Sequence, residues 1–210
     1  MFSLSGSVAA TAARTTPWAG SVADVPLWNV ETLTSPNELR ALEREWRDLE
    51  ARIDDPLTYF QSYDWCKTWS KQFAAAQPGP NCKVRGMQVF AVRQEGKLAA
   101  VLPFAVYRKW GTVDVARLLG APFCEYGNVL LDRDAFRPEE LPALWHTVTA
   151  QLDADVVAVD DFPEHSPLVE LIGKERILPS AACYSSLIAV FSVFRRVPIL
   201  QGTVRQSAGT

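Results

Sequence analysis

The chain has 210 residues and a formal net charge of −3, with 48% hydrophobic and 21% charged residues, a composition typical of one soluble globular domain with loose ends. Its basic residues occur in short pairs, such as Arg108–Lys109, and not in a stripe. These properties exclude a broad electrostatic attraction to nucleic acid or anionic lipid, so we expect no nucleic-acid partner.

The N-terminal part of the chain predicts a leader, a strand and a helix. Residues 1–27 are rich in Ala, Ser and Thr and have no charged stretch before an apolar core, so a disordered leader is expected. A short strand over 27–33 precedes a helix over 35–53, which begins with the capping box Ser35-x-x-Glu38. Apolar residues then recur every three or four positions and predict one buried stripe: Leu39, Leu42, Trp46, Leu49 and Ile53.

The stretch YFQSYDWCKTWSKQF, residues 59–73, concentrates aromatic rings in a second predicted helix. If that helix begins at Ser62 or Asp64, aromatic side chains four residues apart share one face: Trp65, Trp69 and Phe73. Packing in the core is the commoner role of such a stripe, and a ligand groove is the alternative.

The pattern then changes to strands. Residues 84–93 and 98–108 predict a hairpin with Gly96 at its turn. Pro103 in the second arm implies an edge, a bulge or a bend, because proline donates no hydrogen bond to a neighbouring strand.

The remaining elements alternate between strand and helix. They are a strand over 113–120 and 126–131, a helix over 137–152, a strand over 155–162, a helix over 166–173 and a strand over 184–194. This order predicts an α/β fold with a mixed, largely antiparallel sheet flanked by helices. We assign this domain to residues 28–190 and an irregular tail to 191–210.

Cysteine and histidine usage argues against metal and redox chemistry. The four cysteines lie far apart, without a C-x-x-C pair, and the chain has only two histidines. We therefore expect no metal site and reduced thiols in a cytoplasmic protein. No apolar run approaches the roughly 20 residues that span a bilayer, so no membrane span is predicted.

Four blocks carry a resemblance to a known family: YFQSYDWCKTWSKQF, FAVRQEGKLAAVLPFAVYR, ARLLGAPFCEYGNVLL and VVAVDDFPEHSPL. In this order, over about residues 28 to 185, they resemble acetyltransferases of the CelD type, which have the GNAT acyltransferase fold. The resemblance implies transfer of an acyl group from acetyl-CoA or another acyl-CoA to an amine or hydroxyl. It also implies a role in cellulose or exopolysaccharide biosynthesis.

Proteins of this kind are longer and resemble a pair of GNAT-like halves, of which this chain looks like the first. The resemblance thus implies a second GNAT-like half as a partner. The end of the chain, FSVFRRVPILQGTVRQSAGT, does not continue the expected pattern, and we hypothesise a truncated or frame-shifted chain. Sequencing the gene beyond codon 190 tests this, and an intact stop codon in a clean frame would contradict it.

The segment that corresponds to the family's pyrophosphate cradle is residues 131–141. Family members use a glycine-containing loop at a helix N-terminus there, where backbone N–H groups bind the phosphates. This segment has no glycine and carries four acidic residues: Asp132, Asp134, Glu139 and Glu140. Because Arg133 and Arg137 offset only part of that charge, we expect the chain to bind acyl-CoA poorly by itself.

The best candidate catalytic cluster is CEYGN, residues 124–128. Glu125 is predicted to act as a general base and Tyr126 as a proton donor, while Asn128 orients the substrate with its amide. The alternative is a solvated turn in which Asn128 begins a strand. The resembling family has an acidic-aromatic-x-polar pattern at this place.

Three more residues are predicted to bind substrate. Phe60 and Gln61 precede the aromatic helix, and Asp160 ends a buried strand, where α/β proteins often place binding groups. Solvation of a loop is the alternative for Asp160. Two functions follow: an acyltransferase acting on a small-molecule or saccharide substrate, or a non-catalytic GNAT-like half that binds a substrate or partner.

Overall fold

The computed structural model of the chain describes residues 28–72, 82–121, 124–173, 178–179 and 187–191. Its strands are β1 (Trp28–Leu33), β2 (Cys82–Gln94), β3 (Lys97–Lys109), β4 (Val113–Leu118), β5 (Leu130–Leu131), β6 (Val156–Phe162), β7 (Leu178–Pro179) and β8 (Leu187–Phe191). Its α-helices are α1 (Pro36–Ala41), α2 (Glu43–Ile53), α3 (Tyr63–Gln72), α4 (Leu141–Gln151) and α5 (Pro167–Ile172). Its 3-10 helices are η1 (Pro56–Gln61), η2 (Arg133–Ala135) and η3 (Pro138–Glu140).

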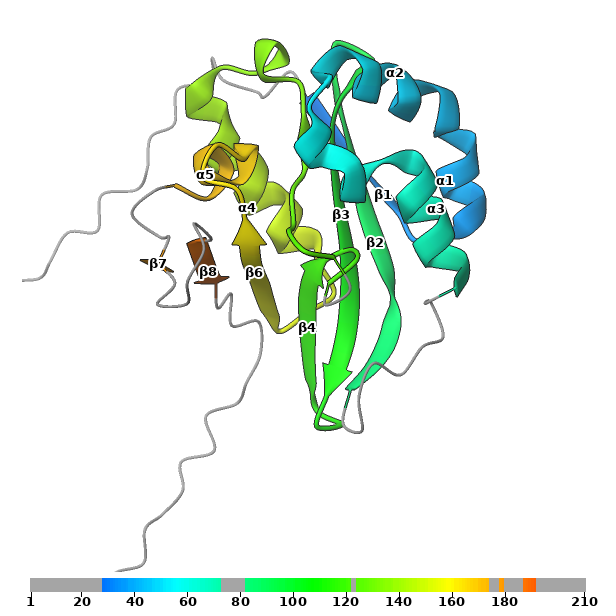
Figure 1. Ribbon diagram of the computed structural model, residues 1–210, viewed down its shortest axis with the longest axis vertical. Coiled ribbons are helices and arrows are strands. Elements are labelled where there is room, and N and C mark those ends of the chain that lie inside the picture. Colours follow the sequence, from blue (N-terminus) through cyan, green and yellow to red (C-terminus); the bar gives the residue numbers. More distant parts are fainter. Residues whose placement is uncertain (1–27, 73–81, 122–123, 174–177, 180–186, 192–210) are drawn as a thin grey trace, which may run out of the picture.

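These elements form one sheet with a helical layer on each face. Helices α1, α2 and α3 cover one face, and α4 and α5 cover the other (Figure 1). The strand order is β1-β2-β3-β4-β6-β8-β7, and β5 pairs with β3. Among the described strand pairs only β4 and β6 run parallel. The predicted α/β class, with a mixed, largely antiparallel sheet flanked by helices, is confirmed.

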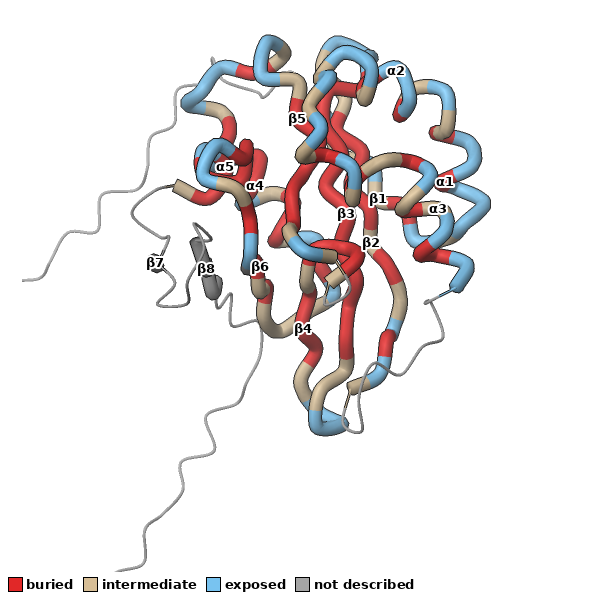
Figure 2. Tube along the Cα trace, in the orientation of Figure 1, coloured by how far each residue is buried: buried red, intermediate tan, exposed pale blue. Residues whose placement is uncertain are grey.

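Strand β3 lies inside the sheet and is buried on both faces (Figure 2). From Ala100 to Tyr107 its side chains alternate between the two cores: one core takes Ala100, Leu102, Phe104 and Val106, and the other takes Val101, Ala105 and Tyr107. Burial on both faces explains why this strand reads as a continuous apolar run instead of an alternating one.

Pro103 lies where β3 changes its partner. On one side β3 pairs with β5 up to Val101, and with β4 from Phe104 onwards. The carbonyl of Pro103 points to this side, because it accepts a hydrogen bond from Leu119 N at 2.9 Å. The nitrogen of Pro103 faces the same side, in the interval between β5 and β4. A residue without an N–H group is therefore tolerated inside the sheet at this position.

The predicted helix over 35–53 is two helices that share one stripe. The capping box is confirmed, since Ser35 Oγ accepts from Glu38 N and the Glu38 carboxylate accepts from Ser35 N. The chain tightens at Leu42, whose N–H donates to Leu39 O at 3.1 Å, and this turn separates α1 from α2. The stripe is buried except for the half-buried Ile53.

Helix α3 buries a different face from the one predicted. Ser62 stands at its start, because its Oγ accepts from Trp65 N at 3.3 Å. The buried side chains are Tyr63, Cys66, Trp69 and Ser70. Trp65 is only half-buried, at the side of the helix, and Phe73 lies outside the described residues. Trp69 is thus a core residue as predicted, whereas Trp65 is free to take part in a surface site.

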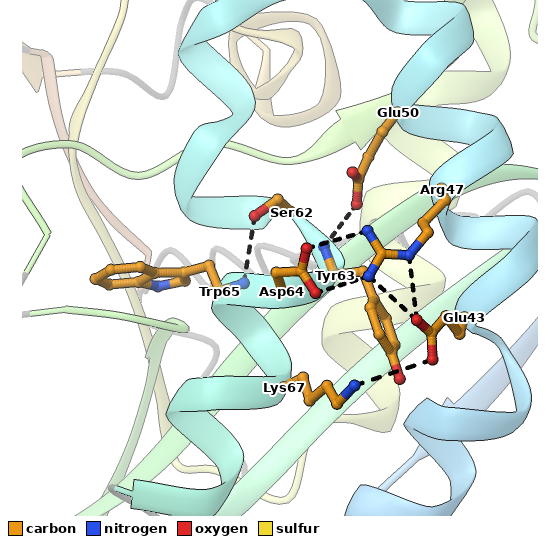
Figure 3. Close-up of polar contacts among 8 residues, drawn as sticks. All are labelled: Glu43, Arg47, Glu50, Ser62, Tyr63, Asp64, Trp65 and Lys67. Atoms are coloured by element: carbon orange, nitrogen blue, oxygen red, sulfur yellow. Dashed lines mark hydrogen bonds and ion pairs between the residues drawn. The ribbon is translucent and has the colours of Figure 1, made fainter.

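Polar contacts join α2 to the start of α3 (Figure 3). Arg47 donates to both carboxylate oxygens of Asp64, at 2.7 and 3.0 Å, and also to Glu43. Glu50 Oε1 accepts from Tyr63 N at 2.6 Å, which satisfies one of the free N–H groups in the first turn of α3. Together these contacts fix the segment that carries the aromatic residues.

Glu50 gives this junction a pH dependence. Burial raises the pKa of the Glu50 carboxyl above its ordinary value of 4.5, although the hydrogen bond from Tyr63 N–H acts against this shift. The folded state therefore binds the proton more tightly than the unfolded state. The stabilisation by this group is fully present below pH 4.5 and is lost as the pH rises through the raised pKa.

We predict that Glu50→Gln gains stability relative to wild type as the pH rises through this window, because glutamine keeps the accepting oxygen without a titrating charge. Urea unfolding of both proteins from about pH 4 to about pH 7 measures this. Glu45→Gln is the matched control. The hydrogen bond from Arg93 lowers the pKa of Glu45, so this variant should lose relative stability over the same rise. If the stability difference from wild type changed with pH in the same direction for both variants, the raised pKa of Glu50 would be contradicted.

Two predicted boundaries fall outside the described residues. These are the leader, residues 1–27, and the tail, residues 191–210, apart from Phe191 at the end of β8. Within the described part of the chain, no helix combines the length and apolar character needed to cross a bilayer.

Candidate functional site

A small pocket lies where the parallel strands β4 and β6 part. Their register pairs Val115 with Val156 and ends at Arg117 and Ala158. Beyond this point β6 continues beside β8 through an irregularity, and β4 leads into a loop. The pocket has a volume of about 80 Å³ and is lined by Arg117, Leu118, Ala121, Cys124, Tyr126, Gly127 and Asp161. The end of the β4–β6 ladder thus gathers charged, thiol and phenol groups in one place.

Gly120 shapes the loop that follows β4. Its φ of +106° lies in the region that favours glycine. A Cβ at this position would lie 3.1 Å from Trp65 Nε1 and 3.2 Å from Cys124 Sγ. The next residue, Ala121, accepts a hydrogen bond from Tyr107 Oη at 2.5 Å. The close approach of the loop to α3 therefore depends on the missing side chain of Gly120.

Four rings, the aromatic cluster Tyr59, Phe60, Trp65 and Tyr126, stand beside this pocket. Phe60 packs edge-on against Tyr126 at 4.9 Å and against Trp65 at 5.0 Å between ring centroids. Tyr59 lies 5.4 Å from Phe60 and 5.9 Å from Trp65, and its side chain is 61% exposed. The structure thus brings together Phe60 and Tyr126, two residues that the sequence analysis placed in the site, through a ring contact.

Tyr126 is held in its protonated form. Burial raises the pKa of its phenol, and the nearby charges of Asp55, Glu125 and Cys124 raise it further. Glu125 itself is exposed, next to Tyr126 in the loop. A protonated phenol beside an accessible carboxylate can serve as a proton donor and a proton acceptor, respectively. This arrangement is compatible with the roles predicted for both residues, which stay predictions.

Asn128 is completely buried and joins three segments. Its Nδ2 donates to Leu57 O in η1 at 3.0 Å. Its Oδ1 accepts from Ser166 Oγ at 2.7 Å and from Val129 N at 2.9 Å. Ser166 in turn caps α5 by accepting from Leu168 N. Asn128 therefore positions the loop that carries Tyr126, rather than presenting its amide at the surface.

Gln61 is also completely buried, directly after Phe60 in η1. Its backbone carbonyl accepts from Trp46 Nε1 at 3.1 Å. Within the described residues, neither Oε1 nor Nε2 of its side chain has a hydrogen-bond partner. Buried polar groups are normally paired, so this amide is an unusual feature next to the aromatic cluster.

The acidic residue at the pocket is Asp161. The predicted binder Asp160 lies in β6, and its side chain is outside the described part of the structure. Asp161 lines the pocket, has a φ of +52°, and accepts from Gly127 N at 2.8 Å through its backbone carbonyl. The register between Val159 and Phe162 is irregular, and nothing in the local sequence reports that irregularity.

The arginine side chains of residues 131–141 form hydrogen bonds and ion pairs with other residues of the chain. Arg133 donates to Glu170 at 3.0 Å and to the His165 carbonyl at 2.8 Å, and Arg137 donates to Glu140 at 2.8 Å. Two short 3-10 helices, η2 and η3, precede α4, and η3 ends with two glutamates. Both arginines that would offset the acidic charge are therefore already engaged.

A larger groove of about 500 Å³ lies at the turn between β2 and β3. It is lined by Gln94, Glu95, Lys97, Leu98, Ala99, Asp132, Asp134 and Ala135. Arg52 partly neutralises its acidic side by donating to Asp132 at 3.1 Å. We place the candidate site at the smaller pocket, since that pocket and the aromatic cluster combine a proton donor, a carboxylate and the exposed ring of Tyr59.

No three His, Cys, Asp or Glu side chains of the described residues form a group that could hold a metal ion. The polar residues that line the pocket are Arg117, Cys124, Tyr126 and Asp161. Comparison of the chain with protein-family models, with curated proteins and with solved structures found no match in any of the three.

Proposed function

We propose that this chain is an acyltransferase domain of the GNAT type, which takes part in acyl transfer from acetyl-CoA or another acyl-CoA to an amine or sugar hydroxyl. The observation that carries the proposal is the pocket where β4 and β6 part, with Tyr126 at its wall and the aromatic cluster beside it. A cytoplasmic setting is inferred from the cysteine usage alone, and a role in exopolysaccharide synthesis from the sequence resemblance alone.

In this proposal the acceptor lies against the aromatic cluster. The exposed ring of Tyr59 and the half-buried rings of Phe60 and Trp65 offer apolar faces to a sugar or an alkyl amine. Glu125 removes the proton from the attacking nitrogen or oxygen, and the Tyr126 phenol protonates the departing thiolate. Asp161 attracts a cationic acceptor through its exposed carboxylate.

A second function is favoured by residues 131–141. Their acidic side chains stand before α4, and both arginines are held in ion pairs. A diphosphate near these carboxylates would be repelled. In this alternative the chain is a non-catalytic GNAT-like unit that binds the acceptor, while a second GNAT-like unit supplies the acyl-CoA site.

Titration calorimetry with acetyl-CoA separates the two functions. The enzyme proposal expects saturable binding in the micromolar range and release of free thiol when amines or sugars are added. Glu125→Gln is then expected to lower kcat at least about 100-fold, the usual contribution of a general base. Glu95→Gln, an exposed glutamate at the β2–β3 turn, is the matched control and should keep its activity. No binding of acetyl-CoA up to millimolar concentration would leave the non-catalytic function.

A further inference from the structure

The turn between β3 and β4 carries an exposed tryptophan far from the candidate site. Trp110 and Gly111 have φ values of +51° and +74°, and Thr112 N donates to Lys109 O at 3.1 Å. Two successive positive φ values define a type I′ turn, where Asn-Gly is the preferred pair. Figure 1 shows this turn at the end of the sheet that points away from the helices. Figure 2 shows the same turn exposed.

Trp110 is an unfavourable residue for this place on two counts. Its backbone lies in the left-handed region, which side chains larger than that of asparagine rarely adopt. Its side chain is 70% exposed, so burial of the ring offsets little of the energy of the strained backbone. Among the described residues its ring makes no aromatic or cation–π contact. A strained and exposed ring of this kind indicates a contact outside the chain.

Basic side chains near Trp110 are of two kinds, those paired with acidic groups and those without such a partner among the described residues. Arg85 and Arg108 both donate hydrogen bonds to Asp114, and Arg85 also forms an ion pair with Asp153 at 3.5 Å. Lys83 and Lys109 have no ion-pair partner within the described residues. They lie on neighbouring strands beside the turn, where Lys83 stands opposite Arg108 and Lys109 stands opposite Cys82, so the two lysine side chains extend to opposite faces of the sheet. The turn is therefore flanked by two ammonium groups without an ion-pair partner in the described part of the chain, although the whole chain has a net charge of −3.

We propose that this tryptophan tip, defined as Lys83, Lys109 and Trp110, binds the surface of anionic lipid membranes. The indole ring enters the interfacial layer, which tryptophan prefers, and the lysines lie at the level of the lipid phosphates. A single projecting turn offers much less than the roughly 800 Å² per partner of a stable protein interface. A lipid surface adapts to a small projection, so it fits this geometry better than a protein partner does. The contact is local and needs no broad positive surface.

Sedimentation with lipid vesicles tests the proposal on the full chain. Wild type is expected to bind vesicles of equal parts phosphatidylserine and phosphatidylcholine at about 0.1 M salt, and to dissociate as the salt rises. Binding to phosphatidylcholine alone should be much weaker. Lys109→Glu should lower the partition coefficient at least about fivefold, the contribution of one lysine near an anionic surface.

Trp110→Asn removes the ring and places a residue in the turn that tolerates positive φ. It is expected to lower the partition coefficient about tenfold, through loss of the apolar contact, while its resistance to urea stays equal to wild type or rises. Lys97→Glu, at the turn between β2 and β3, is the matched charge control and should bind like wild type.

Three results would overturn the proposal. The first is the absence of wild-type binding to the anionic vesicles. The second is unchanged binding by both Trp110→Asn and Lys109→Glu, or equal wild-type binding to phosphatidylcholine alone. The third is a dimer in ultracentrifugation that Trp110→Asn dissociates, without any vesicle binding, because the tip would then be a contact between two copies of the chain.

Discussion

Replacing Asn128 with alanine is expected to lower the free energy of unfolding by about 3 kcal/mol. The substitution removes three hydrogen bonds in a fully buried place and leaves the Leu57 carbonyl, the Val129 N–H and the Ser166 hydroxyl with one partner fewer. A buried group that loses its partner cannot form a hydrogen bond with water instead, so each lost hydrogen bond lowers the stability by its full amount. Urea unfolding followed by circular dichroism measures the change.

The control for this prediction is Ser166→Ala. It removes one of the three contacts and the cap of α5, so a smaller loss of about 1 kcal/mol is expected. Limited proteolysis of the two variants reports on the position of the Tyr126 loop. This loop should become more accessible to protease in Asn128→Ala than in Ser166→Ala. A loss below 1 kcal/mol in Asn128→Ala would mean that the loop is held by other contacts.

Gly120→Ala is the second substitution with a large expected effect, about 2 to 4 kcal/mol of lost stability. Two causes add: the φ of +106° strains an alanine, and its Cβ meets Trp65 Nε1 and Cys124 Sγ at 3.1 and 3.2 Å. One of the two side chains must therefore move, and both belong to the candidate site. Chemical unfolding gives the stability, and the reaction rate of Cys124 with a thiol reagent reports on the displaced pocket.

Gly96→Ala separates the two causes. Gly96 has a φ of +81° and no neighbour within 4 Å of its hypothetical Cβ, so it reports backbone strain alone, about 1 kcal/mol. The difference between the two variants measures the contact with Trp65 and Cys124. Equal losses of stability in the two variants would show that Trp65 and Cys124 move aside without an energetic penalty. The conformation of the loop would then not depend on the small size of Gly120.

Local signals in the sequence predicted the helix ends well. The capping box at Ser35 and Glu38 and the Ser166 cap with Pro167 in the first turn are both present. Pro142 also lies in the first turn of α4, as expected from its lack of an N–H group. These features depend on residues three or four positions apart, so no tertiary information is needed to read them.

Features that depend on the partner strand were harder to predict. The sequence indicated an irregularity at Pro103, but its place inside the sheet follows from the change of partner from β5 to β4, which only the topology reveals. The strand expected over 126–131 is reduced to Leu130 and Leu131, because Asn128 is drawn to η1 and α5 instead of a neighbouring strand.

The candidate site was predicted in part. Phe60 and Tyr126 were both named from the sequence, and their rings are in contact. Trp65 was expected in the core, but the buried face of α3 is centred on Tyr63, Cys66 and Trp69, one position out of phase with the predicted stripe. Several rings in one short helix allow more than one buried face, and only the surface against which the helix packs decides between them.

The position of β1 in the sheet has a consequence for the order of folding. β1 pairs with β2, yet the whole helical segment from Pro36 to Gln72 separates them along the chain. β2, β3 and β4, by contrast, are joined by tight turns, so their meander closes only short loops and can assemble first. We expect β1 and its three helices to dock late onto this preformed meander, with the helical layer that supports the aromatic cluster among the last parts to become native.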